Sequence, residues 1–219
     1  MSSQAITHYP VHTSPCSRVQ LGAMKREYLE RLVPWANDLE ATGGLRLNPP
    51  VMYEHEVEWF DSLPKARNQE VFAILVKDDS AEGEYQYVGH TGLHNIHFPS
   101  AHATSGTFIG DPKARGRGIG KIAKLLLLHH AFHHAGLRKV VSDVKSFNLA
   151  SIGHLIACGY KVVGVQRDHY FHEGDFVDRV ILEIHRADFE PIWGKYQRTE
   201  RAPSLSVKQK KRIAKLNRT

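Results

Sequence analysis

The sequence predicts a mixed α/β domain in which helices flank one sheet. Segments with the alternating or continuous apolar pattern of strands are interleaved with segments of helical spacing. A length of 219 residues suits one domain with a sizeable core. The 42% of hydrophobic and 24% of charged residues are ordinary for a globular protein.

The first half of the chain opens with the alternating stretch RVQLGAM, which predicts a strand. Leu29, Leu32 and Trp35 then recur at helical spacing, and Pro64 ends a second helical stretch. The runs VFAILV and YQYVGHTGLHNI are typical of strands, with DDSAEGE as a hairpin loop between them. In residue numbers, these elements are a strand at 18–24, helices at 25–40 and 51–63, strands at 71–76 and 85–96, and loops at 43–50 and 78–84.

The second half alternates strands and helices around a glycine-rich loop. The predicted strand ATSGTFIG leads into that loop, a long helix follows as far as Gly136, and Gly159 has the position of a helix C-cap. The turn HEGD joins the last two strands. These elements are strands at 103–110, 139–144, 161–171 and 176–186, and helices at 119–135 and 148–159.

We predict three parts along the chain: a flexible segment at 1–17, a folded domain at 18–190 and a basic tail at 191–219. Residues 195–219 hold nine Lys/Arg and one acid, Glu200, a net charge of +8 in a chain whose total is +6. The rest of the chain therefore sums to −2, which argues against a basic nucleic-acid-binding face on the fold. We expect the tail to be disordered, with a short surface helix around Ile213 and Leu216 as the alternative.

Cysteine usage and hydropathy predict a cytoplasmic protein. No apolar run is long enough to span a bilayer, and the polar start MSSQAITHYPVHTSPCS lacks the apolar core of a secretory signal. Cys16 and Cys158 are far apart and lack metal-type spacing, so we expect no disulfide and no cysteine metal site.

The stretch ARGRGIGKIAK at 114–124 is the first candidate for chemistry, because its glycines alternate with basic residues before a helix. It is not a nucleotide P-loop, since Arg115 replaces the first glycine and Ile122 replaces the metal-binding hydroxyl residue. Its G-x-G-x-G spacing in mid-chain also differs from a dinucleotide fingerprint. The remaining pattern, Arg-x-x-Gly-x-Gly, suits an anion held by backbone N–H groups at a helix start, and a simple tight turn is the alternative.

At these residues the chain resembles the GCN5-related N-acetyltransferase (GNAT) family, whose pyrophosphate loop reads Gln/Arg-x-x-Gly-x-Gly/Ala. The stretch NLASIGHLIACGY is similar to that family's Asn-x-x-Ser-Ile motif and its Gly-aromatic end. Two further segments resemble its ribosomal-protein N-acetyltransferase (RimJ/RimL-type) branch. The resemblance covers about 18–186 and is carried, besides the loop, by Trp35, Asn37, Asp38, Asn148, Ser151, Gly159, Tyr160, Arg167, Gly174 and Asp178.

The resemblance implies a mixed, mostly antiparallel sheet that is splayed between its fourth and fifth strands and flanked by helices. It also implies acetyl-CoA as cosubstrate, with the pantetheine arm beside the fourth strand and the pyrophosphate in the glycine loop. The cofactor-binding residues that it implies are Phe108, Ile109, Gly110, Arg115, Gly116, Arg117, Gly118, Ile119, Gly120, Lys121, Asn148 and Ser151.

Acetyl transfer to an amine needs a proton acceptor, donors for the oxyanion and a partner for the leaving thiolate. Many members of the family use a tyrosine for the thiolate, but Leu155 stands at that position here. We therefore predict Ser151 as the thiolate's hydrogen-bond donor; the alternative is that it only satisfies helix backbone. The candidate bases are His94, Asp143 and Glu173, and a water chain without a single base is the alternative.

The residues Trp35, Asn37 and Asp38 are implied to shape the acceptor pocket, where Asp38 or Glu40 would attract a cationic amine. The alternative is that Trp35 packs under the sheet while Asn37 and Asp38 end a helix.

The stretch LLHHAFHHAG pairs His129 with His133 and His130 with His134 at i, i+4, a spacing that can hold Zn²⁺. No glutamate intervenes as in H-E-x-x-H, and the sequence indicates no third ligand. We therefore predict no metal site.

The sequence thus predicts an acetyl-CoA-dependent N-acetyltransferase that acts on a primary amine, with no membrane partner. The acceptor is left open between a protein N-terminus, an amino sugar and another small amine such as a polyamine. The alternatives are a non-catalytic module that binds coenzyme A or a partner, and a ribosome- or RNA-associated protein tethered by its basic tail.

Overall fold

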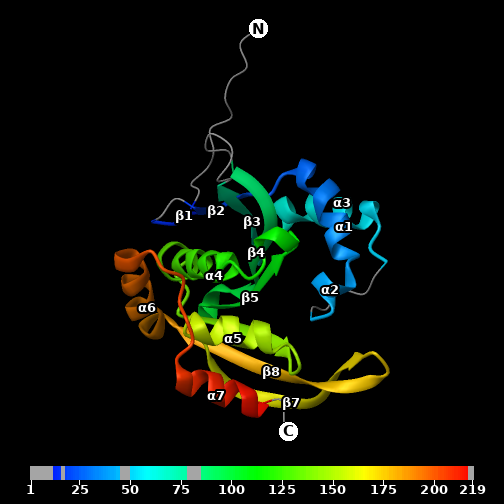
Figure 1. Ribbon diagram of the computed structural model, residues 1–219. Coiled ribbons are helices and arrows are strands. Elements are labelled where there is room, and N and C mark those ends of the chain that lie inside the picture. The colour runs from blue at the N-terminus through cyan, green and yellow to red at the C-terminus, as the bar shows by residue number, and fades with distance from the viewer. Residues whose placement is uncertain (1–11, 16–17, 45–49, 78–84, 217–219) are drawn as a thin grey trace.

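One eight-stranded sheet runs through the computed structural model, which describes residues 12–15, 18–44, 50–77 and 85–216 (Figure 1). Its order is β1-β2-β3-β4-β5-β6-β8-β7, and each neighbouring pair is antiparallel except β5 with β6. The mixed, mostly antiparallel sheet is thereby confirmed. The strands are β1 (His12–Thr13), β2 (Val19–Ala23), β3 (Glu70–Lys77), β4 (Tyr85–His97), β5 (His102–Ile109), β6 (Lys139–Lys145), β7 (Lys161–His172) and β8 (Asp175–His185).

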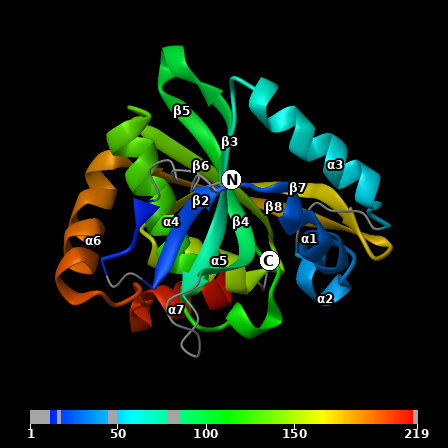
Figure 2. The same ribbon diagram turned by 90° about the horizontal axis from the view of Figure 1, so that it is seen from above.

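Helices flank the sheet on both sides (Figure 2). They are α1 (Leu29–Ala36), α2 (Leu39–Thr42), α3 (Tyr53–Ser62), α4 (Ile119–His129), α5 (Leu149–Ala157), α6 (Arg186–Thr199) and α7 (Val207–Leu216), with a π-helix, η5 (His130–His134), continuing α4. The predicted loop at 78–84, most of the loop at 43–50, and Cys16 lie outside the described residues.

Two cores hold the helices to the sheet. The larger core lies around α4, which contacts β2, β4 and β5 and is apolar on nearly all sides because other elements surround it. The smaller core lies on the opposite face, where Leu29 and Leu32 of α1 pack on Phe108 of β5 together with side chains of α3. Strand β5 is therefore covered on both faces, and both candidate cavities described below border it.

Two predicted helices are divided in the structure. The helix predicted at 25–40 breaks after Ala36, because Asn37 ends α1 and Asp38 caps the short α2 by accepting a hydrogen bond from the N–H of Glu40. The helix predicted at 119–135 changes to π-helical geometry from His130 onward. Side chains along α4 and along η5 therefore recur at different spacings.

The C-terminal region is helical and packed, although the sequence predicts disorder for its last part. Helix α6 buries Phe189, Trp193 and Tyr196, whose i, i+4, i+7 spacing is that of a helical apolar stripe. Helix α7 contacts α5, and Ile213 is 6% exposed. The alternative of a short helix at residues 207–216 is the one observed.

At the other end of the chain, His12 and Thr13 form strand β1 and pair with β2, although they lie in the segment predicted to be flexible. None of the helices in the described part of the chain has the length and apolar character that crossing a membrane requires.

Candidate active site

The sheet opens between β5 and β6, which are the fourth and fifth of the strands predicted from sequence. Within these two strands, pairing is limited to His102–Thr104 with Lys139–Val141. Just past this point the Ser142 hydroxyl donates a hydrogen bond to the Ser105 carbonyl at 3.1 Å. Beyond Thr104, β5 has no further pairing with β6 in the described part of the chain.

A cavity of 580 Å³ occupies this opening. One wall is the end of β5, with Thr107, Phe108 and Ile109, and the opposite wall is the start of α5. The glycine loop contributes Arg115 to the lining, and α4 contributes Lys124. The cavity is therefore a cleft between two diverging strands, closed at one end by the loop that the sequence singles out.

The glycine loop meets α4 in a backbone geometry that requires glycine at two positions. Gly116 and Gly118 have φ values of 72° and 80°, and Gly118 is the N-cap of α4. The first backbone N–H groups of α4 have no partners within the helix, so this end carries a partial positive charge. An anion is favoured there, as the sequence predicts.

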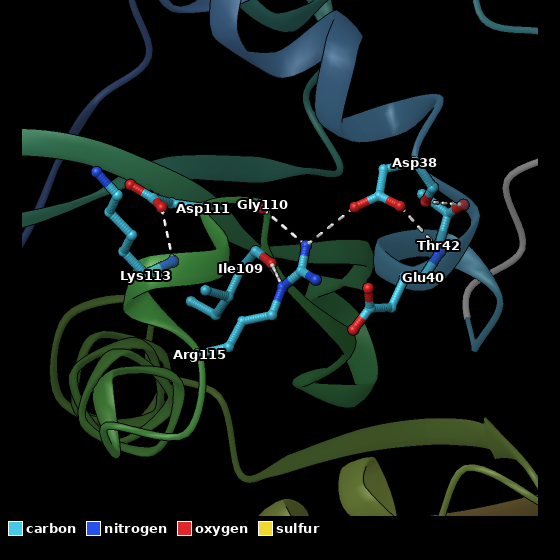
Figure 3. A network of polar contacts seen from close by, with 8 residues as sticks. All are labelled: Asp38, Glu40, Thr42, Ile109, Gly110, Asp111, Lys113 and Arg115. Carbon is cyan, nitrogen blue, oxygen red and sulfur yellow. Dashed lines mark hydrogen bonds and ion pairs between the residues drawn. The ribbon is translucent and has the colours of Figure 1, made fainter.

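Arg115 braces the loop against the end of β5 (Figure 3). Its Nε donates to the Ile109 carbonyl at 3.1 Å, and its terminal nitrogen donates to the Gly110 carbonyl at 2.7 Å. The same terminal nitrogen lies 3.9 Å from an Asp38 carboxylate oxygen. Arg115 thus fixes the relative positions of the strand edge and the loop while remaining part of the cleft lining.

The opposite wall of the cleft begins at the α5 N-terminus. The Asn148 side chain caps this helix by accepting a hydrogen bond from the Ser151 N–H at 3.0 Å. Ser151, His154 and Leu155 line the cleft, so Leu155 lies where the missing tyrosine would have been. Burial and the nearby Lys124 lower the pKa of His154 to about 3, so its ring is neutral near neutral pH.

Lys124 carries a buried amino group close to the point where β5 and β6 cease to pair. It is 1% exposed, and its Nζ donates to the Ser105 hydroxyl at 3.0 Å. Burial lowers its pKa to about 7. A lysine inside the apolar run of a helix is the feature that could have identified it from sequence, because such a run leaves it no solvent-facing side.

A second cavity of 410 Å³ lies on the other face of β5, between the sheet and helices α1 and α3. It shares Thr107 and Phe108 with the 580 Å³ cleft between β5 and β6. Its remaining lining is mostly apolar or aromatic around a few polar groups, and consists of Leu32, Ala36, Glu56, Trp59, His90, Gly92, His94 and Gly106.

The polar groups of this second cavity suit proton transfer. Burial raises the pKa of Glu56, which makes its carboxylate a stronger base than usual. Burial also lowers the pKa of His90 to about 4, so that ring is neutral near neutral pH. Of the three bases named from sequence, His94 is the one that lines this cavity. Sequence reasoning missed Glu56, because a glutamate on an amphipathic helix reads as an exposed residue.

Asp143 and Glu173 are placed elsewhere. Asp143 accepts a hydrogen bond from the Tyr170 hydroxyl at 2.5 Å and pairs with Arg179 at 3.1 Å, while its neighbour Ser142 faces the cleft. Glu173 is an exposed residue of the turn between β7 and β8. Neither lines one of the two cavities, so their role as bases stays a prediction without support from geometry.

The residues Trp35, Asn37 and Asp38 also make contacts outside both linings. The Trp35 ring stacks on Tyr87 with centroids 5.7 Å apart. The Asn37 amide donates to the Val51 carbonyl at 2.8 Å and accepts from the Val51 N–H at 2.8 Å, tying α1 to the start of α3. These contacts support the alternative of packing and helix capping, and a substrate role for the three stays a prediction.

The chain is similar to known acetyltransferases in sequence and in fold. A family model described as "Acetyltransferase (GNAT) domain" matches residues 18–161. The crystal structure of spermidine N-acetyltransferase from Vibrio cholerae in complex with CoA and spermine has a TM-score of 0.71 and 18% identity, covering 79% of this chain and 98% of that one. A crystal structure of mutant forms of the spermidine/spermine N-acetyltransferase from Vibrio cholerae has a TM-score of 0.67 and 18% identity, covering 80% and 98%. At such identities these structures show a shared fold.

Proposed function

The chain belongs to the GNAT acetyltransferase family and is an acyl-CoA-dependent N-acetyltransferase, and from this premise we propose that its acceptor is a small primary amine bound in the 410 Å³ cavity. The observation that carries the proposal is the shared border of the two cavities at Thr107 and Phe108. An acetyl group delivered along the β5 edge of one cavity would there meet an amine held in the other.

The cofactor cleft supplies a place for each part of coenzyme A. The α4 N-terminus, with Gly118 as its N-cap and Gly120 in its first turn, would bind the pyrophosphate. The backbone edge of β5 at Phe108–Gly110 would bind the pantetheine arm, and Asn148 and Ser151 would border its other side. The volume of the cleft and its position between β5 and β6 support this assignment.

The reaction is a direct attack within a ternary complex. The neutral amine nitrogen attacks the thioester carbonyl carbon, the C–N bond forms, the C–S bond breaks, and the amine proton passes to a base. Glu56 is our first candidate base, with His94 beside it in the same cavity. Ser151 would donate a hydrogen bond to the thiolate of coenzyme A, and a backbone N–H of β5 would stabilise the oxyanion.

The composition of the second cavity supports a small cationic acceptor. Glu56 supplies the negative charge and Trp59 an aromatic face, and both attract an ammonium group. A lining drawn from two helices and a sheet suits one amine group on a small molecule. The spermine in the Vibrio cholerae complex is such an amine, which is consistent with this acceptor class. A protein N-terminus, the RimJ/RimL-type branch and ribosome contact remain predictions of the sequence alone.

The proposal is tested with acetyl-CoA and a panel of small amines, amino sugars and peptides with free N-termini. Free thiol reports turnover, and the mass of the acceptor reports the added acetyl group. We expect Glu56→Gln to lower kcat/KM for cationic amines about 100-fold, since general bases contribute about 10²–10⁴ to rates. Glu54→Gln, an exposed residue of the same helix, is the matched control and should match the wild type.

Acetylation restricted to peptide N-termini would contradict the small-amine acceptor. Equal activity in Glu56→Gln and Glu54→Gln would contradict the role of Glu56 as the base. The same assay examines Ser151→Ala, for which we expect a lower kcat with an unchanged KM for the amine. Wild-type turnover in that variant would refute the thiolate role of Ser151.

A further inference from the structure

A cluster of histidines gathers at the C-terminal end of α4, away from both cavities. Since the loop lies at the N-terminal end of this 11-residue helix, the cluster is about 16 Å from it at 1.5 Å per residue. The chain there reads HHAFHH, and the sequence predicts pairs at i, i+4 that lack a third member. In the structure, the spacing of the clustered histidines differs from i, i+4, and a third ring joins the cluster.

The spacing changes because His130–His134 form a π-helix. A π-turn brings residues that are five positions apart onto the same side of the helix. His134 therefore lies near His129 as well as near His130. Their ring centroids are 5.4 Å apart. π-helical turns are rare and occur frequently at functional sites, so a distortion located at these histidines favours a binding role.

The third ring comes from far away in the sequence. His12 on β1 lies over the end of α4, with its ring centroid 4.8 Å from that of His134. One ring nitrogen from each of His12, His129 and His134 lies within 4.8 Å of those of the other two. Three imidazoles, one each from β1, α4 and η5, thus lie close enough together to share one metal ion.

A chain of hydrogen bonds orients the His12 ring from behind. The Glu70 carboxylate lies 2.6 Å from Nε2 of His130, and Nδ1 of His130 lies 2.8 Å from Nε2 of His12. The carboxylate accepts, so Nε2 of His130 donates to it, and the hydrogen bond between the two rings fixes the position of His12. Carboxylate and histidine partners of this kind commonly orient the imidazole ligands of zinc.

From this juxtaposition we propose that His12, His129 and His134 form a Zn²⁺ site that fastens strand β1 to the end of α4. Tetrahedral zinc with Zn–N bonds of about 2.0–2.1 Å holds its nitrogens about 3.4 Å apart, which the rings reach by small rotations. An all-imidazole set suits zinc rather than Mg²⁺ or Ca²⁺, which prefer oxygen ligands. Water takes the fourth position, since His134 is exposed.

The surroundings of His129 hold this ring in place. It packs on Trp193 of α6, with centroids 4.5 Å apart, which limits its rotation. Zinc here would join β1, α4 and the packing of α6, and it would not touch the acetyl-transfer site.

The test is a titration of the chelator-washed full chain with Zn²⁺, followed by calorimetry and by metal analysis after gel filtration. We expect one zinc per chain, a rise in Tm on binding, and Co²⁺ absorption of four-coordinate character in the same site. His134→Ala is the main variant, because an exposed side chain can be removed without opening the core. Its zinc affinity should fall at least about tenfold.

The matched control is His97→Ala, which removes an exposed ring that stacks on His102 elsewhere in the fold. It should bind zinc as the wild type does. His12→Ala checks the ligand from β1 and should lose affinity like His134→Ala. The proposal fails if the wild type does not bind one zinc per chain, or if His134→Ala and His97→Ala bind it equally.

Discussion

At the scale of single residues, Lys124 shows how burial sets the chemistry of a side chain. In water its ammonium group would titrate near 10.5, but in the fold burial lowers its pKa to about 7. The Ser105 hydroxyl is the hydrogen-bond partner of its Nζ. Burial disfavours the charged form of Lys124 in the folded state. The lysine therefore lowers the free energy of unfolding at every pH at which the unfolded chain carries this proton.

The pH dependence of stability follows from this shift. Between pH 7 and about 10.5 the unfolded state binds more protons at Lys124 than the folded state does, so stability rises with pH in this window. Below pH 7 the full cost of the buried charge applies. We expect Lys124→Met to raise the free energy of unfolding by about 2–3 kcal/mol at pH 7, with a gain that shrinks towards pH 10.

Urea unfolding of wild type and Lys124→Met at pH 7 and pH 9.5 measures this difference. Lys113→Met, which removes an exposed lysine, is the control and should show a constant, small difference. A Lys124→Met gain that does not change with pH would show that the lysine is not charged at a cost in the fold.

At the scale of elements, the join between β5 and the glycine loop depends on one close contact with α1. The Trp35 indole covers Gly110 so closely that a Cβ built on Gly110 would lie 2.1 Å from a ring carbon. The Gly110 carbonyl also accepts a hydrogen bond from Arg115. Trp35 therefore fixes α1 against the end of β5 and the start of the loop, in keeping with the alternative that it packs under the sheet.

We expect Gly110→Ala to lower the free energy of unfolding by about 2 kcal/mol, since overpacking of this kind costs about 1–3 kcal/mol. Displacement of the loop should also weaken binding of coenzyme A. Gly164→Ala in β7 is the matched control, because a Cβ there would meet no atom within 4 Å. Thermal unfolding and isothermal titration with coenzyme A measure both effects, and equal stability of the two variants would contradict the role of the Trp35 contact.

At the scale of the whole molecule, the C-terminal region completes the wall behind the cofactor cleft. A Cβ built on Gly118 of the loop would lie 3.2 Å from Cβ of Ala202, and one on Gly153 of α5 would lie 3.3 Å from Leu205. Ile213 of α7 is buried beside the same glycine of α5. The basic residues of α7 therefore sit on a docked helix.

Shortening the buried apolar side chain of α7 should lower the stability of the whole domain. We expect Ile213→Ala to reduce the free energy of unfolding by about 2 kcal/mol, at the low end for a buried aliphatic side chain because α7 lies at the periphery. Lys210→Ala, exposed on the same helix, should change it by less than about 0.5 kcal/mol. A disordered tail would instead give two indistinguishable urea-unfolding curves.

The sequence by itself determined most of the order of strands and helices through local periodicity, and the glycine loop through a backbone that only glycine adopts readily. Gly118 is recognisable without its neighbours for that reason. The enzyme class came from the resemblance of several motifs to the GNAT family. Helix α6 was missed, although Phe189, Trp193 and Tyr196 form an apolar stripe at helical spacing. Helix α7 was named only as the alternative to disorder, because the basic residues of this region favoured a disordered tail.

Only the tertiary structure decided which polar side chains meet. Glu56 of α3 and His94 of β4 face one cavity through contacts between distant segments, while Asp143, on a strand beside the cleft, turns to Arg179 instead. His12 reaches His129 across more than half the chain for the same reason. The sequence gives the chemical type of each side chain. Its burial and its neighbours arise from tertiary packing, and they decide where that chemistry acts.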